Sequence, residues 1–200
     1  MLVLHQMQVS GNCYKVRLTA RQLGIPIALK EYSLHGGETR KPDFLSKNPN
    51  GRVPLLEFED GRTLPESDAI IWHLAEGTKL APESKWDRAQ ALSWMFFEQY
   101  SHEPYIAVAR FLRKFHPDPA SQRALADSKM AGGYRALEVM EQHLKGKSFF
   151  AGERYSIADI ALYGYTHVAH EGGFDLGGFP SIRAWLARVQ AQPGYVGMPA

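Results

Sequence analysis

Polar side chains stand at the start of two expected helices in the first part of this 200-residue chain. Ser10 and Asn12 follow the short apolar run Leu2–Leu4, and Glu66 and Ser67 follow the strand-like segment Arg62–Leu64. The N-terminus of a helix presents unpaired backbone amides and the positive end of the helix dipole, so it favours an anion. A hydroxyl group or a side-chain amide placed there can cap the helix or donate a hydrogen bond to a bound anion.

The single cysteine, Cys13, is expected to be a packing residue. It begins an apolar stripe that continues through Val16, Ala20 and Leu23, and a free cysteine is commonly a small buried hydrophobic side chain. One cysteine excludes an intrachain disulfide framework, an all-cysteine zinc site and a dithiol redox centre.

His167, His170 and Glu171 are the nearest approach to a metal-ligand cluster. They could face one another on a helix, but no third cluster of ligands accompanies them. We therefore expect solvated or core side chains here, and no metal site.

Composition and charge predict a globular protein. Hydrophobic residues make up 44% and charged residues 22% of the chain, which excludes a disordered or fibrous protein. The net charge is only +2 and neither half of the chain is polarised, which argues against nucleic acid or an anionic membrane as the main partner. The N-terminus shows no signal peptide or membrane span, so we expect a cytoplasmic protein.

The hydrophobic pattern predicts a small α/β layer in the first domain, residues 1–79. Strands are expected at Leu2–Leu4, Ile27–Tyr32, Val53–Phe58 and Arg62–Leu64, with helices after Ser10, around Pro42–Lys47, and from a Ser67 N-cap through Gly77. The strand and helix order βαβ-ββα predicts parallel strands first and then an antiparallel hairpin.

The second domain, residues 85–200, is expected to be entirely helical, after a linker near Thr78–Ser84. Pro104 should kink or interrupt the long helical stretch that ends near Phe115. Ser156 and Asp159 have the spacing of a capping box, which we interpret as purely structural.

The order of elements and four segments of this chain resemble the cytosolic glutathione transferase family, whose first domain is thioredoxin-like. The segments are Ser10–Arg17, Asn48–Pro54, Glu66–Ile70 and Ser156–Asp159. Each motif alone is weak, but together they occur in the family's order and spacing along essentially the whole chain. The resemblance implies a homodimer that uses glutathione as a co-substrate and needs no metal or organic cofactor.

The first segment implies the thiol-activating residues. Ser10 occupies the position of the catalytic serine in the theta-, delta- and zeta-like classes, and the reactive cysteine of other classes aligns with Ser10 rather than with Cys13. A thiol with a pKa near 8.5 must lose about two units to be ionised at neutral pH, which takes roughly 2.7 kcal/mol of selective anion stabilisation. One charge-assisted hydrogen bond and a helix N-terminus can supply it. The amide of Asn12 is the alternative donor, because the Gly11–Asn12 pair departs from the better-known serine-class patterns.

The second segment implies a backbone contact. Family members use the residue before a cis-proline to pair with the cysteinyl part of glutathione, which is Val53 before Pro54 here. Arg52 is the candidate for the glycyl carboxylate, which suits a guanidinium, and Arg40 and Lys41 are its rivals.

The third segment implies the site for the γ-glutamyl group. In the family the serine and the amides of the helix turn hold the α-carboxylate, here Ser67, and the preceding acidic residue, here Glu66, accepts from the α-amino group. A zwitterion needs one partner for its anionic group and one for its cationic group, side by side.

For the second substrate, a hydrophobic electrophile, the resemblance implies a pocket between the two domains. Tyr100, His102 and Tyr105 flank Pro104, where a kink could open a cleft, and are the candidate lining residues. The predicted activity is glutathione S-transfer to that electrophile. The alternatives are a zeta-like glutathione-dependent isomerase, a dehalogenase or peroxidase, and a non-catalytic binding or regulatory protein.

Overall fold

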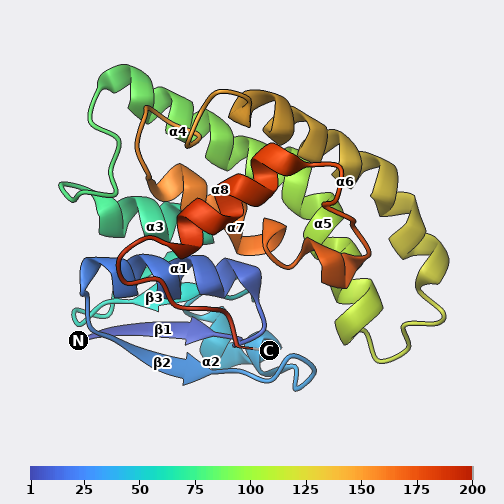
Figure 1. The fold of residues 1–200 in the computed structure, drawn as a ribbon. Coiled ribbons are helices and arrows are strands. Elements are labelled where there is room, and N and C mark those ends of the chain that lie inside the picture. Colours follow the sequence, from blue (N-terminus) through green and yellow to red (C-terminus); the bar gives the residue numbers. More distant parts are fainter. Residues whose placement is uncertain (200) are drawn as a thin grey trace. The chain divides into compact units, whose positions relative to one another are not determined.

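The computed structural model describes residues Met1–Pro199, which fall into two compact units (Figure 1). Unit 1 comprises Met1–Thr78 together with the C-terminal segment that begins at Pro193, and unit 2 comprises Lys79–Gln192. The boundary after Thr78 lies at the start of the expected linker. The helical unit ends at Gln192, and the segment that begins at Pro193 packs with unit 1.

Unit 1 contains a four-stranded mixed sheet in the order β2-β1-β3-β4. The strands are β1 (Leu2–Gln6), β2 (Ile27–Glu31), β3 (Leu55–Glu57) and β4 (Thr63–Pro65). Strand β1 pairs with β2 in parallel and with β3 antiparallel, and β3 pairs with β4 antiparallel. The predicted thioredoxin-like order of one parallel crossover followed by a hairpin is therefore confirmed.

Three α-helices and one 3-10 helix accompany the sheet. They are α1 (Gly11–Leu23), the 3-10 helix η1 (Glu38–Arg40), α2 (Pro42–Leu45) and α3 (Ser67–Ala75). Gly24 ends α1 in the left-handed conformation, with φ of 67°, as the sequence predicted. Helices α1 and α3 pack against each other, and the ring of Phe44 on α2 contacts the His5 ring of β1.

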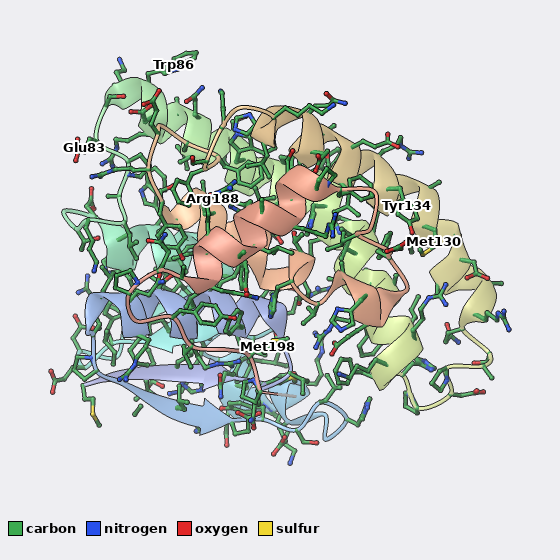
Figure 2. The ribbon with its side chains drawn as sticks, viewed as in Figure 1. Glu83, Trp86, Met130, Tyr134, Arg188 and Met198 are labelled. Atoms are coloured by element: carbon green, nitrogen blue, oxygen red, sulfur yellow. The ribbon has the colours of Figure 1, made fainter. Side chains whose placement is uncertain are left out.

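The C-terminal segment runs beside α1, antiparallel to it (Figure 1). The hydroxyl of the buried Tyr14 donates to the carbonyl of Val196 at 2.6 Å. Gly194 passes so close that a Cβ there would lie 3.1 Å from the Cα of Gln22. Met198, labelled in Figure 2, is half-buried near the end of this segment.

Unit 2 is helical throughout. Its helices are α4 (Lys85–Phe97), the π-helix η2 (Glu98–His102), α5 (Glu103–Arg110), the π-helix η3 (Phe111–Phe115), α6 (Arg123–Leu144), α7 (Ile157–Thr166), the 3-10 helix η4 (Ala169–Gly172) and α8 (Pro180–Gln190). Within Met1–Pro199, none of the helices combines the length and apolarity needed to cross a membrane.

Pro104 interrupts the long helical stretch, as predicted, and does so through a π-helix. Pro104 is near the start of α5, and the preceding turn, Glu98–His102, widens to the π form. Proline has no amide proton and its ring crowds the preceding turn, so a local change of helix type accommodates it.

Helix α7 forms the centre of unit 2, because every one of its residues is buried. The predicted capping box is present: the hydroxyl of Ser156 accepts from the first turn, and the carboxylate of Asp159 accepts from the amide of Ser156 at 3.0 Å. Asp159 also accepts from the indole of Trp185 at 2.9 Å and from the amide of Phe150 at 3.2 Å. This carboxylate therefore ties the start of α7 to α8 and to the preceding loop.

Candidate functional site

The start of α1 carries Ser10 as its N-cap. The Ser10 hydroxyl accepts from the amide of Cys13 at 3.3 Å, which is the capping role the residue type predicts. Because the amide supplies that proton, the hydroxyl's own proton can still be donated to an anion. Ser10 and Asn12 are both half-buried, so a ligand can reach this end of the helix.

Cys13 is entirely buried, which confirms the expectation that it packs in the core. Burial raises the pKa of the Cys13 thiol to about 11, although hydrogen bonds from the Met7 amide and from Ser10 oppose that rise. A thiol in this state is protonated at neutral pH and is a poor nucleophile.

The start of α3 differs from the prediction at one position. Glu66, and not Ser67, is the N-cap, and Ser67 is the first helical residue. Glu66 has φ of 71°, a value that costs a non-glycine residue of order 1–3 kcal/mol. The Glu66 side chain is exposed and takes no part in capping, among the hydrogen bonds of the described residues. The first-turn amides of α3 are thus not covered by the side chain of their own N-cap.

A hydrogen bond joins the start of α3 to the start of α1. The hydroxyl of Ser67 donates to Oδ1 of Asn12 at 3.3 Å, across 55 positions of sequence. Two segments of predicted site residues therefore lie together at the N-terminal ends of α1 and α3.

Lys15 lies beneath this junction and was missed as a site residue in the sequence. Its side chain is 0% exposed, and Nζ lies 3.4 Å from Ser67 Oγ and 3.3 Å from Asp68 Oδ1. Lys15 follows Asn12 by three residues and so shares its face of α1, which is the signal that could have revealed it.

The loop before β3 is fixed by a turn. Gly51 donates to the carbonyl of Asn48 at 2.9 Å and has φ of 64°, and a Cβ at Gly51 would lie 2.9 Å from the Thr39 carbonyl. Glycine is therefore required here on both conformational and steric grounds. The Val53–Pro54 bond is cis, as the resemblance implied.

The two predicted guanidinium candidates have different surroundings. Arg40 donates to the carbonyl of Asn50 at 3.0 Å and so braces the turn. Arg52 is exposed, and its carbonyl accepts from the side chain of Asn48 at 2.8 Å. Their roles toward the glycyl carboxylate, and those of Lys41, Val53 and Pro54 toward glutathione, stay predictions.

The three residues predicted for the electrophile pocket have different surroundings within unit 2. Tyr100 is 85% exposed, whereas His102 is 0% exposed and shares a 2.9 Å hydrogen bond with Thr166. The ring of Tyr105 packs on Gly132, where a Cβ would lie 2.2 Å from the ring. His102 and Tyr105 thus have packing roles in addition to any role in substrate binding, which stays a prediction.

His167, which follows α7, is also engaged in packing, whereas His170 is exposed. The imidazole of His167 shares a 2.7 Å hydrogen bond with the carbonyl of Tyr163, and burial lowers the pKa of His167 to about 4. Glu171 forms ion pairs with Arg110 and Lys114, each at 2.5 Å.

Comparison with known proteins agrees with this architecture. Residues 9–76 match the family model of the glutathione S-transferase N-terminal domain, and residues 94–193 match that of the C-terminal domain. A solved glutathione S-transferase from Pseudomonas fluorescens is 49% identical, with a TM-score of 0.96 over 100% of this chain and 99% of that one.

Two more distant proteins extend the comparison. A glutathione transferase from Burkholderia graminis, solved with two glutathione molecules per subunit, is 28% identical, with a TM-score of 0.82 over 96% of this chain and 85% of that one. The disulfide-bond oxidoreductase YfcG of Escherichia coli is 26% identical over 91% of this chain and 87% of its own length. With both domain models matched in order along most of its length, the chain belongs to the glutathione S-transferase family.

Proposed function

We propose that this protein is a glutathione transferase, in which Asn12 and Ser10 stabilise the thiolate of glutathione for attack on a hydrophobic electrophile. The observation that carries the proposal is the 3.3 Å hydrogen bond between Ser67 and Asn12. It brings the residue expected at the γ-glutamyl carboxylate within one hydrogen bond of the residue expected at the sulfur. Both ends of one glutathione molecule can then be held at a single site.

The γ-glutamyl group would bind at the start of α3. Its α-carboxylate would accept from the first-turn amides, which suit an anion, and its α-amino group would donate to the exposed carboxylate of Glu66. The cis bond before Pro54 would present the backbone of Val53 to the cysteinyl part.

The thiolate would lie at the start of α1. The amide of Asn12 and the hydroxyl of Ser10 can each donate to sulfur, and the N-terminus of α1 adds its positive dipole. Cys13 takes no part, because its own thiol is buried and protonated. The sulfur that reacts therefore belongs to glutathione.

The test is a pH titration of bound glutathione by thiolate absorbance, in the wild type and in the variants Ser10→Ala and Asn12→Ala. We expect a pKa below the ordinary thiol value in the wild type, and a rise of about one unit when a donor is lost. If the wild type binds no glutathione, the transferase proposal fails. If it binds glutathione without ionising it, a non-catalytic binding protein is the better description.

A disulfide-exchange activity is the second candidate, favoured by the likeness to the Escherichia coli oxidoreductase. The first glutathione thiolate would attack a substrate disulfide, forming a mixed disulfide and releasing one substrate thiolate. A second glutathione thiolate would then attack the mixed disulfide, giving glutathione disulfide and the other substrate thiolate. Because Cys13 is 0% exposed, no protein disulfide would form, and alkylation of the folded protein would leave this activity intact.

A homodimer is the expected assembly. Leu92, Phe96 and Tyr100 follow one another at four-residue intervals on α4 and η2, and all three are exposed in the single chain. An exposed apolar row of this kind is typical of an interface. Light scattering after size exclusion should give twice the mass of 22.5 kDa, and the variant Phe96→Glu should shift the protein toward the monomer.

A further inference from the structure

The ammonium group of Lys15 is buried below the two segments of the glutathione site. Its side chain is 0% exposed, and it forms an ion pair with Asp68 at 3.3 Å. Burying an ammonium is costly unless it is paired and hydrogen bonded, so this position demands a structural or functional reason. The second neighbour of the ammonium supplies one, since Nζ also lies 3.4 Å from the hydroxyl of Ser67.

The ammonium favours one direction for the next hydrogen bond, and the structure has that direction. An ammonium group has three donors and no acceptor, so the Ser67 oxygen must accept from Lys15. The single proton of the hydroxyl is then donated onward, and Oδ1 of Asn12 lies 3.3 Å away to accept it. Donation runs in one direction, from Lys15 through Ser67 to Asn12.

This direction decides which end of the Asn12 amide faces the ligand. With Oδ1 committed to Ser67, the NH2 group is the end of the amide that can donate to a ligand. A donor stabilises a thiolate, whereas a carbonyl oxygen at the same place would repel it. The orientation of one amide group therefore decides whether Asn12 helps or opposes ionisation.

We propose that Lys15 is a positioning residue, which orients the Asn12 amide through Ser67 so that its NH2 group faces the sulfur of glutathione. This inference rests on the proposed function, because it concerns the same thiolate. It means that Lys15, although buried, influences the pKa of the bound glutathione thiol.

The test compares Lys15→Met with Lys15→Arg, each titrated for the ionisation of bound glutathione. We expect Lys15→Met to raise the pKa of the bound thiol by about one unit, roughly a tenfold decrease of its ionisation constant. Lys15→Arg keeps a cationic donor and should retain most of the ionisation. Lys47→Met is the matched control, because it removes another ion-paired lysine of unit 1, the partner of Glu57.

A double-mutant cycle separates the relay from a simple charge effect. In the Asn12→Ala background, Lys15→Met should change the thiol pKa no further, because the amide that Lys15 orients is gone. An equal rise of the pKa with and without Asn12 would mean that the charge of Lys15 acts directly on the sulfur, which overturns the relay.

A folding defect would not obscure the result. The double variant Lys15→Met/Asp68→Asn removes both charges and leaves no unpaired buried ion, so it should fold and show the same rise of the thiol pKa. If the wild type ionises glutathione and this variant does so equally well, the inference about Lys15 is wrong while the proposed function stands. If the wild type does not bind glutathione, both are wrong.

Discussion

Helix α3 in unit 1 and helix α7 in unit 2 each begin with a serine followed closely by an aspartate. At the start of α7, Ser156 is the N-cap, and its hydroxyl and the Asp159 carboxylate satisfy the chain's own amides. At the start of α3, Ser67 lies one position further along, and its hydroxyl contacts Asn12 and Lys15 instead. A helix start whose amides are capped by the chain itself contributes to folding, whereas a helix start with uncapped amides can bind a ligand.

The backbone conformation of the N-cap residue also differs between the two helices. Ser156 has the extended backbone typical of a cap, whereas Glu66 has φ of 71°. A conformation that disfavours folding at one helix start and not at the other is consistent with a binding role for Glu66. The difference predicts that substitutions at α7 change stability, and that substitutions at α3 change glutathione binding.

The largest effect is expected for Asp159→Ala. The substitution removes the acceptor for the Trp185 indole and for the amides of Phe150 and Ser156. All three hydrogen bonds are buried. We expect a loss of about 3–5 kcal/mol in the free energy of unfolding, measured by urea denaturation. A loss below about 1 kcal/mol would contradict the view that α7 is held by this carboxylate.

The pH dependence of stability should show two opposing groups in unit 2. Burial lowers the pKa of His167 to about 4, so between this value and its unfolded value the unfolded chain binds the extra proton and stability rises with pH. Burial raises the pKa of Asp159 to about 7, so over a similar range the folded chain holds the extra proton and stability falls as pH rises. Each contribution is on the order of 3 kcal/mol.

Variants separate these two slopes. His167→Gln should make stability fall more steeply as pH rises between about pH 4 and about pH 7 than it does in the wild type, and Asp159→Asn should make it rise more steeply. Urea midpoints at several pH values within that range would measure the slopes. Parallel slopes in both variants would show that neither group titrates as described.

Glu66→Gly should move stability and binding in opposite directions. Glycine tolerates the positive φ, so the free energy of unfolding should rise by about 1 kcal/mol. Loss of the carboxylate should weaken glutathione binding by about 10- to 100-fold, as expected for a hydrogen bond to a charged group. Calorimetry of glutathione binding checks this, with Glu66→Gln as the control that keeps the shape and the strain. Unchanged affinity in both variants would remove Glu66 from the site.

The smallest effect is expected for Ser156→Ala. Loss of an N-cap costs about 1 kcal/mol of stability. Glutathione affinity should stay at the wild-type value in the same calorimetric experiment. A clear loss of affinity would break the distinction between a structural and a ligand-binding helix start.

The sequence predicted those features that depend on local pattern. The Ser156–Asp159 spacing, the Gly24 stop and the antiparallel hairpin of β3 and β4 each follow from residue types a few positions apart, and all three are confirmed. The cis bond before Pro54 could be expected only from the family resemblance, because few bonds before proline are cis.

Features that depend on distant residues were missed. Serine is a common N-cap, so local preference favoured Ser67, but the bond to Asn12 and the buried ammonium fix it as the first helical residue. Lys15 would be expected at the surface, and its ion pair with Asp68, 53 positions away, compensates for its burial. The docking of the last residues on unit 1 rests on the bond from Tyr14 to Val196, 182 positions apart.

That last contact bears on the order in which the protein can fold during synthesis. Because Met1–Thr78 and the segment that begins at Pro193 both belong to unit 1, the helical unit is an insertion within it. Val196 must leave the ribosome before Tyr14 can reach its acceptor, so this contact of unit 1 forms only after unit 2 has been synthesised. Unit 2, whose residues are contiguous, can fold first. Its folding shortens the effective loop between the two segments of unit 1, which lowers the entropic cost of bringing them together.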